Sequence, residues 1–243
     1  MQTSSANATH YPTLRKRAAA AFVLTASAAL GTGLALGASG LSLWAPAKAV
    51  ALVALLAALS VPSLHQHDRP GLGPANWVTL GRAVLVAGLA GLLGESVHDA
   101  GVMVAAVGLL AFGLDWLDGQ IARRTGWSSP FGARLDMELD ALTVLVLCGL
   151  AWQLDRAGAW VLWCGALRYL FVAASWIWTW MDRELPPDPR RRFVCGVQIS
   201  TVLLCLLPWP GPWSAVIAAF GTVVLTWSFA VDTTWLYQHR ADT

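Results

Sequence analysis

Long apolar segments recur along the whole chain, and they restrict its fold more than any other feature. Eight of them lie near residues 18–40, 45–63, 76–94, 100–122, 134–154, 158–181, 193–208 and 213–236. A helix needs about 20 mostly apolar residues to cross a bilayer, and most of these segments have that length. Connections rich in Pro and Gly separate them. The pattern therefore predicts an all-α, polytopic integral membrane helix bundle.

The composition excludes an ordinary soluble domain. Of the 243 residues, 56% are hydrophobic and 12% are charged, whereas soluble domains carry about 25% charged residues. The formal net charge of +2 is too small to indicate a nucleic-acid partner. The four cysteines form no C-x-x-C pair and lie in apolar segments, which favours buried thiols over a zinc site or a disulfide. We expect stability to come from close helix packing through Ala and Gly.

Basic residues collect in alternate connections between the apolar segments. Examples are Arg15-Lys16-Arg17 before the first segment, Arg123-Arg124 after the fourth and Arg190-Arg191-Arg192 before the seventh. With eight spans these clusters fall on one side, which the positive-inside rule makes the cytoplasmic side. We therefore expect both termini on the cytoplasmic side of a bacterial-type inner or plasma membrane, and the acidic run described next on that side too.

Four aspartates interrupt two consecutive apolar segments. Asp115 and Asp118 are near the end of one segment, and Asp136 and Asp140 are near the start of the next. An ionised side chain at bilayer depth costs roughly 2.5–3.5 kcal/mol, so four uncompensated anions are untenable there. At about 100° per residue, each pair occupies one face of its helix. The connection contains Gly, Ser and Pro, so the helices can pack antiparallel with their four carboxylates facing one another.

Divalent cations would neutralise such a cluster. Two of them balance four carboxylates, and Mg²⁺ or Mn²⁺ prefers an all-oxygen ligand set. The run contains no His or Cys, which argues against zinc. Glu138 projects from the opposite side of its helix and is expected outside the site. The sequence thus predicts a site for two cations, with Asp115, Asp118, Asp136 and Asp140 as candidate ligands.

Small and basic residues accompany the aspartates. Gly119 follows Asp118 and Ala122 lies one turn further, so a bulky flat group can approach the helix backbone. Arg123 lies at the expected membrane edge, where a guanidinium suits a phosphate. This combination favours a nucleotide diphosphate over a bare ion. A small transporter with a carboxylate cation path is the alternative, but such a path favours acids spread across bilayer depth.

The complete pattern is D-x-x-D-G-x-x-A-R-x8-G-x-x-x-D-x-x-x-D. Its defining residues are Asp115, Asp118, Gly119, Ala122, Arg123, Gly132, Asp136 and Asp140. It resembles the signature of the class I CDP-alcohol phosphotransferases (CDP-alcohol phosphatidyltransferases), integral membrane enzymes of phospholipid synthesis. The resemblance covers residues 71–243 and implies a six-helix catalytic unit. Residues 18–70 would then add a transmembrane hairpin, and residues 1–17 a cytoplasmic tail.

The resemblance also implies roles for individual residues. Asp115, Asp118 and Asp136 would bind a pair of Mg²⁺ or Mn²⁺ ions, and Asp140 would be the general base and a further metal contact. The segment from Asn76 through Thr79 to Arg82 resembles the family's N-x-x-T-x-x-R motif. The implied nucleotide-binding residues are Asn76, Thr79, Arg82, Gly119, Ala122, Arg123 and Gly132. The implied reaction transfers a phosphatidyl group from CDP-diacylglycerol to an alcohol and releases CMP.

The acceptor alcohol is left open by these motifs. Arg134, Arg168, Arg191 and Arg192 can form a pocket for a phosphorylated acceptor, or can pair with internal acids and lipid phosphates. A phosphorylated acceptor favours glycerol 3-phosphate, which would give phosphatidylglycerophosphate. Inositol phosphate, phosphatidylglycerol and serine are the alternatives. The small-residue helix faces permit a homodimer.

Overall fold

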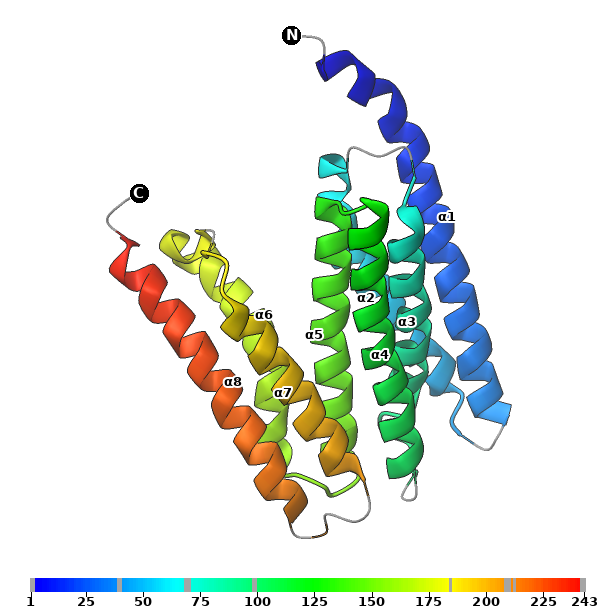
Figure 1. Ribbon diagram of the computed structural model, residues 1–243. Helices are drawn as coiled ribbons and strands as arrows, with labels where there is room; N and C mark the ends of the chain where they lie inside the picture. The colour runs from blue at the N-terminus through cyan, green and yellow to red at the C-terminus, as the bar shows by residue number, and fades with distance from the viewer. Residues whose placement is uncertain are drawn as a thin grey trace. The chain divides into compact units, whose positions relative to one another are not determined.

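The computed structural model describes residues 3–38, 41–67, 71–97, 100–183, 185–207, 211 and 213–240, and nearly all of them are helical (Figure 1). The α-helices are α1 (Thr3–Ala38), α2 (Trp44–Ser60), α3 (Gly73–Gly91), α4 (Gly101–Thr125), α5 (Pro130–Gln153), α6 (Leu162–Ile177), α7 (Pro189–Leu206) and α8 (Trp213–Gln238). Short 3₁₀-helices are η1 (Val61–Gln66), η2 (Ala159–Val161) and η3 (Thr179–Asp182). Since the described residues form no strand, the predicted all-α class is confirmed.

Five helical segments among the described residues are long and apolar enough to cross a membrane. They are Thr13–Leu36, Trp44–His65, Gly101–Thr125, Ala159–Ile177 and Trp213–Gln238. These five identify an integral membrane protein. The helices outside this set, α3, α5 and α7, carry the polar residues of the sequence motifs or the triple arginine. Eight spans, the orientation and the membrane type stay predictions.

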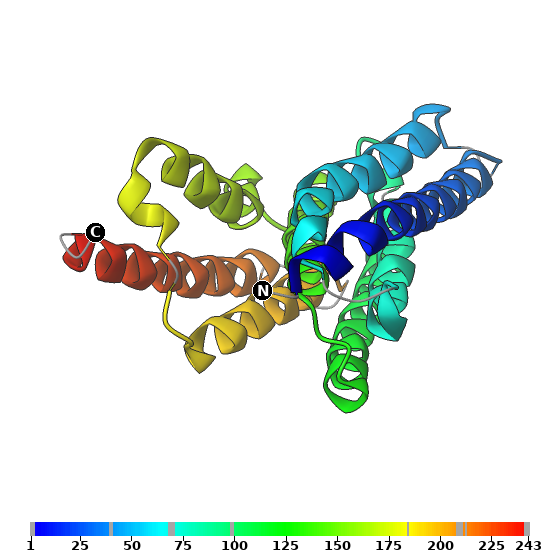
Figure 2. The same cartoon turned by 90° about the horizontal axis from the view of Figure 1, so that it is seen from above.

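The chain divides into two compact units. The first comprises Met1–Val97 and Ala106–Thr143, and therefore contains α1, α2, α3, most of α4 and the first half of α5. In this unit α1, α2 and α3 pack against one another, as Figure 2 also shows. Buried alanines fill these contacts, among them Ala29, Ala45, Ala49, Ala83 and Ala87. The predicted packing through small residues is confirmed, because only small side chains let helix backbones approach this closely.

Polar contacts join both ends of the N-terminal hairpin to the segments that flank α3. At one end Lys48 Nζ lies 2.5 Å from Glu95 Oε1, and Ser42 donates to the same carboxylate. The hydrogen bond from Lys48, with those from Ser42, lowers the pKa of Glu95 to about 2. At the other end His67 Nε2 lies 2.8 Å from Gly71 O, and its ring meets Phe131 edge-on at 5.9 Å. The start of α5 is therefore held beside η1.

The second unit comprises His98–Ala105 and Val144–Thr243. Here α8 packs against both α6 and α7. Asp188 caps α7 by accepting from Arg190 N at 2.8 Å, and the guanidinium of Arg190 pairs with Asp232 on α8. Cys148, Cys164 and Cys205 are buried in this unit, as the apolar segments predicted, whereas Cys195 is only half-buried.

The first compact unit contains the N-terminal hairpin together with α3, so the hairpin does not form a unit of its own. The predicted boundary between the hairpin and the catalytic unit lies at residue 70. Residues 68–70 are outside the described part of the chain, so this boundary stays a prediction. Helix α1 begins at Thr3, so it includes most of the predicted tail of residues 1–17.

Candidate active site

The first turns of α3 present three polar side chains on one face. Asn76, Thr79 and Arg82 follow one another at intervals of three residues and are only 4%, 3% and 2% exposed. Asn76 Nδ2 donates to Leu72 O at 2.5 Å. Thr79 Oγ1 lies 3.1 Å from Ala75 O and 3.0 Å from Asp118 Oδ2 on α4. The motif on α3 is therefore joined directly to the acidic run.

Arg82 lies at the centre of the four aspartates. Its Nη1 is 2.8 Å from Asp115 Oδ1, 3.0 Å from Asp118 Oδ2 and 2.8 Å from Asp136 Oδ1. Its Nη2 is 2.7 Å from Asp140 Oδ1. The guanidinium thus connects α3 with both acidic helices, α4 and α5. The four carboxylates converge as their spacing predicted.

One guanidinium cannot balance this cluster. Four carboxylates facing a single arginine leave a formal excess of three negative charges when all are ionised. Taking charges out of water costs several kcal/mol per ion unless each is compensated. The cluster can hold a divalent cation, because one oxygen each of Asp115, Asp118 and Asp136 lie within 4.8 Å of one another. The donor set is all carboxylate, which suits a hard cation.

Asp140 lies at the side of this close group of three. Its carboxylate is held by Nη2 of Arg82, whereas the other three aspartates share Nη1. Its side chain is 27% exposed, similar to 28% for Asp115 and below 39% for Asp136, whereas Asp118 is only 5% exposed. The roles of Asp140 as general base and of its neighbours as metal ligands stay predictions.

A pocket of about 140 Å³ adjoins the carboxylates. Five predicted nucleotide-binding residues line it, namely Asn76, Thr79, Gly119, Ala122 and Gly132. A Cβ at Gly132 would lie 2.6 Å from Asn76 Oδ1, so a larger residue would displace that side chain. The pocket therefore requires the glycine found in the signature.

A family model for CDP-alcohol phosphatidyltransferases matches residues 72–231. The chain belongs to the CDP-alcohol phosphatidyltransferase family. No curated protein and no solved structure gave a significant match. As a CDP-alcohol phosphatidyltransferase, the protein is a phosphotransferase of phospholipid synthesis that acts on a CDP-alcohol and an alcohol acceptor. The match begins at residue 72, so α1 and α2 lie outside it.

The pocket of this phosphatidyltransferase also contains residues that the sequence reasoning missed. Trp127, Ser128 and Ser129 come from the connection between α4 and α5, which we had interpreted only as a turn. Ser129 Oγ accepts from Gly132 N at 3.1 Å, which caps the start of α5. Trp127 packs over Gly73, whose φ of +78° and close contact with the ring both require glycine. The signal in the sequence that could have placed this connection at the pocket was Trp127, an aromatic residue between the two halves of the signature.

The predicted arginines are distributed over both compact units. Arg123 is exposed at the end of α4, and its side chain folds back toward Gly119. Arg134 pairs with Glu138 one turn further along α5, with Nε 2.8 Å from Oε1. In the second unit, Arg168 is on α6, and Arg191 and Arg192 are in the first turn of α7. Arg191 donates to Pro186 O. Their roles toward nucleotide or acceptor stay predictions.

Proposed function

We propose that the protein transfers the phosphatidyl group of CDP-diacylglycerol to a small phosphorylated alcohol and releases CMP. The observation that carries this proposal is the contact between the two family motifs. The polar face of α3 and the aspartates of α4 and α5 form one connected network centred on the buried Arg82. The adjoining pocket is lined by the small residues of the same signature. A transporter would have no need for this pocket beside its acids.

The close carboxylates are the proposed ligands of two divalent cations, Mg²⁺ or Mn²⁺. Asp115, Asp118 and Asp136 supply the oxygens, and Asp140 is the adjacent further ligand. When bound, the cations supply positive charge that neutralises the diphosphate and the departing phosphate. Arg82 on α3 keeps the four acids of α4 and α5 assembled, so the protein does not have to collect them when substrate arrives.

The small pocket suits one part of the nucleotide. Its volume of about 140 Å³ is below the roughly 300–1,000 Å³ of pockets that enclose a whole ligand. Gly119, Ala122 and Gly132 leave room for a flat ring against the helix backbones, and Asn76 and Ser129 provide polar atoms beside it. We therefore assign the cytosine base to this pocket, with Arg123 at its edge toward a phosphate.

Asp140 is the proposed general base. Its carboxylate takes the proton of the acceptor hydroxyl, and the oxygen attacks the phosphorus that carries diacylglycerol. The bond from that phosphorus to the CMP oxygen breaks, and CMP leaves with the electron pair. A carboxylate is a weak base for an alcohol, so positioning of the two reactants must supply much of the acceleration.

Glycerol 3-phosphate is the acceptor that we favour, because a phosphate gives the predicted arginines a ligand. Arg168, Arg191 and Arg192 of the second unit are the candidates for binding it. Inositol phosphate, phosphatidylglycerol and serine are the alternatives. We further propose that the site faces the cytoplasm, where such acceptors are dissolved, and that the chain forms a homodimer.

The test supplies membranes containing the protein with CDP-diacylglycerol, Mg²⁺ or Mn²⁺, and one acceptor at a time, and measures CMP. We expect release with a single acceptor and its loss in a chelator. The Asp140→Asn variant should bind the CDP-lipid but turn over at least a thousandfold more slowly, within the range for loss of a general base. Turnover at the wild-type rate in that variant would remove the base assignment. Cation flux without CMP release from any acceptor would favour the transporter.

A further inference from the structure

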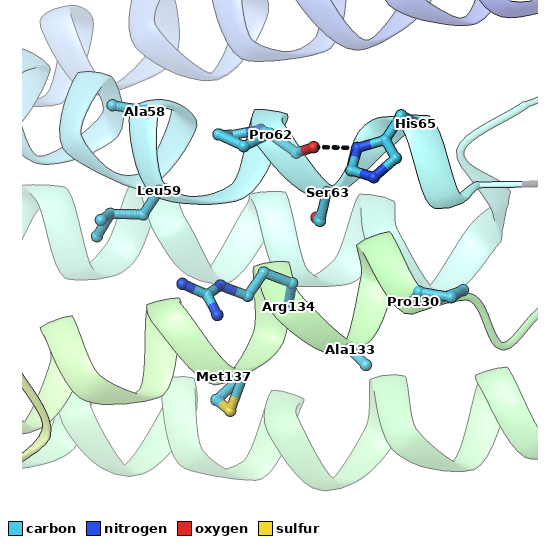
Figure 3. A pocket seen from close by; sticks show the side chains of 9 residues that line it. All are labelled: Ala58, Leu59, Pro62, Ser63, His65, Pro130, Ala133, Arg134 and Met137. Atoms are coloured by element: carbon cyan, nitrogen blue, oxygen red, sulfur yellow. Dashed lines mark hydrogen bonds between the residues drawn. The ribbon is translucent and has the colours of Figure 1, made fainter. Parts of the chain in front are cut away.

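A second pocket in the first unit lies between the N-terminal hairpin and the catalytic helix α5 (Figure 3). Its volume is about 640 Å³, and its walls are the end of α2, the following turn η1 and the first two turns of α5. It is open to the surroundings, because Ala58, Pro62, His65 and Met137 in its lining are all exposed. The α2–η1 wall lies outside the part of the chain that matches the family.

The α2–η1 wall of this pocket changes from apolar to polar along the helix axis, from Ala58 and Leu59 to Ser63 and His65. On α5, Met137 lies toward the first end and Pro130 and Ala133 lie toward the second, as Figure 3 shows. The eight residues from Pro130 to Met137 span about 10 Å along α5. A pocket on a membrane helix with this gradient fits a phospholipid, whose acyl chains extend from a polar head group.

Arg134 gives the pocket a positive charge at the junction of its two ends. It is 38% exposed, whereas its partner Glu138 is only 2% exposed. The ion pair with Glu138 uses Nε, so the buried acid orients the guanidinium, which lies between the α2–η1 segment and α5 in Figure 3. A guanidinium fixed in this way suits two oxygens of one phosphate.

This pocket is separate from the carboxylate cluster. Arg134 projects about 120–160° around α5 from Asp136 and Asp140. Only Ala133 lines both this pocket and the small pocket beside the cluster. A ligand bound here would join the hairpin to α5 without entering the active site.

We propose that this pocket binds one anionic phospholipid of the surrounding bilayer, with its phosphate on Arg134 and its acyl chains along Ala58, Leu59 and Met137. The inference does not depend on the proposed reaction, because its readout is lipid retention. It gives Arg134 a lipid phosphate as ligand in place of the phosphate of a soluble acceptor.

Native mass spectrometry of the purified full chain tests this proposal. The protein is given equal amounts of dioleoylphosphatidylglycerol and dioleoylphosphatidylcholine, and the lipids retained per chain are counted. We expect one phosphatidylglycerol, retained about tenfold over phosphatidylcholine, because both phosphates can accept from Arg134 but the choline ammonium adds a positive charge beside the guanidinium. Ala58→Trp fills the apolar end and should abolish this retention while the Arg134–Glu138 pair stays intact. Ala51→Trp is the matched control, because Ala51 is exposed on the same face of α2, two turns away, and does not line the pocket.

Two further measurements separate the sources of phosphate. The double variant Arg134→Gln/Glu138→Gln removes both charges together, and should lower the preference for phosphatidylglycerol about tenfold while leaving some lipid bound. Millimolar glycerol 3-phosphate should not displace the lipid. Equal retention by Ala58→Trp and Ala51→Trp, with both variants monodisperse, would overturn the proposal. Displacement by glycerol 3-phosphate would overturn it as well, and would return Arg134 to the acceptor.

Discussion

Replacing Arg82 by Gln removes the positive charge at the centre of the acidic cluster. The guanidinium makes four ion pairs of 2.7–3.0 Å, and its side chain is 3% exposed. Removing one partner of a buried ion pair costs about 3–5 kcal/mol, because the other partner is left uncompensated. At about 2–4 °C per kcal/mol for a chain of this size, Tm should fall by about 6–20 °C in the presence of a chelator.

Divalent cations should change this result in a defined direction. In Arg82→Gln, Mg²⁺ or Mn²⁺ supplies the charge that the variant lacks, so saturating cation should raise Tm more than it does in the wild type. Thermal unfolding of the purified protein in detergent, with and without chelator, measures both effects. Arg124→Gln is the control, since Arg124 is also basic but exposed at the end of α4. An Arg82→Gln variant as stable as the control in chelator would refute the reasoning.

Two other variants test the glycine in the pocket and the contact that fastens the hairpin. Gly132→Ala puts a Cβ 2.6 Å from Asn76 Oδ1 and should raise KM for the CDP-lipid about tenfold. Gly81→Ala is the control, because a Cβ there meets nothing within 4 Å, and it should leave KM unchanged. Equal KM values for the two variants would show that the pocket tolerates a side chain. The pKa of Glu95 is lowered to about 2 in the folded protein from about 4.3 when unfolded, so its stabilising effect is complete above that unfolded value and is lost as pH falls toward 2. The Tm advantage of wild type over Glu95→Gln should therefore shrink between pH 5 and pH 3, and a constant difference would contradict this linkage.

The local part of the site could be predicted from the sequence, because helical periodicity alone brings the members of each pair together. Asp115 and Asp118 share one face of α4, and Asp136 and Asp140 share one face of α5, as their spacing required. Small residues likewise predicted the close packing of the hairpin. These features depend on positions three or four residues apart, which a single sequence reveals directly.

The position of Arg82 could not be predicted in the same way. Arg82 is on α3, whereas the four aspartates are on α4 and α5. Its approach to them therefore depends on how α3 packs against these two helices. The resemblance suggested a nucleotide ligand for it, whereas the described contacts are with carboxylates. Trp127 and Ser129 were missed for a related reason, since a connection has no periodicity to show which way its side chains point.

The pocket beside Arg134 depends on a local detail that hydropathy does not contain. The chain continues from α2 into the 3₁₀-helix η1 at Val61–Gln66, which brings Ser63 and His65 opposite α5. Apolar runs predict that a helix exists but not how its last turn is wound. Glu138 was expected outside the metal site, and its i,i+4 spacing from Arg134 is compatible with their ion pair, but the sequence does not show that Arg134 lines a pocket with η1.

Binding of Mn²⁺ to the purified protein in the presence of CDP tests the central claim most directly. Electron paramagnetic resonance counts the ions held per chain, and the account predicts two in the wild type. It predicts that Asp118→Asn, which alters the most buried acid of the cluster, loses at least one of them. Failure of the wild type to bind Mn²⁺ saturably, or full retention of both ions by the variant, would contradict the assignment of these aspartates.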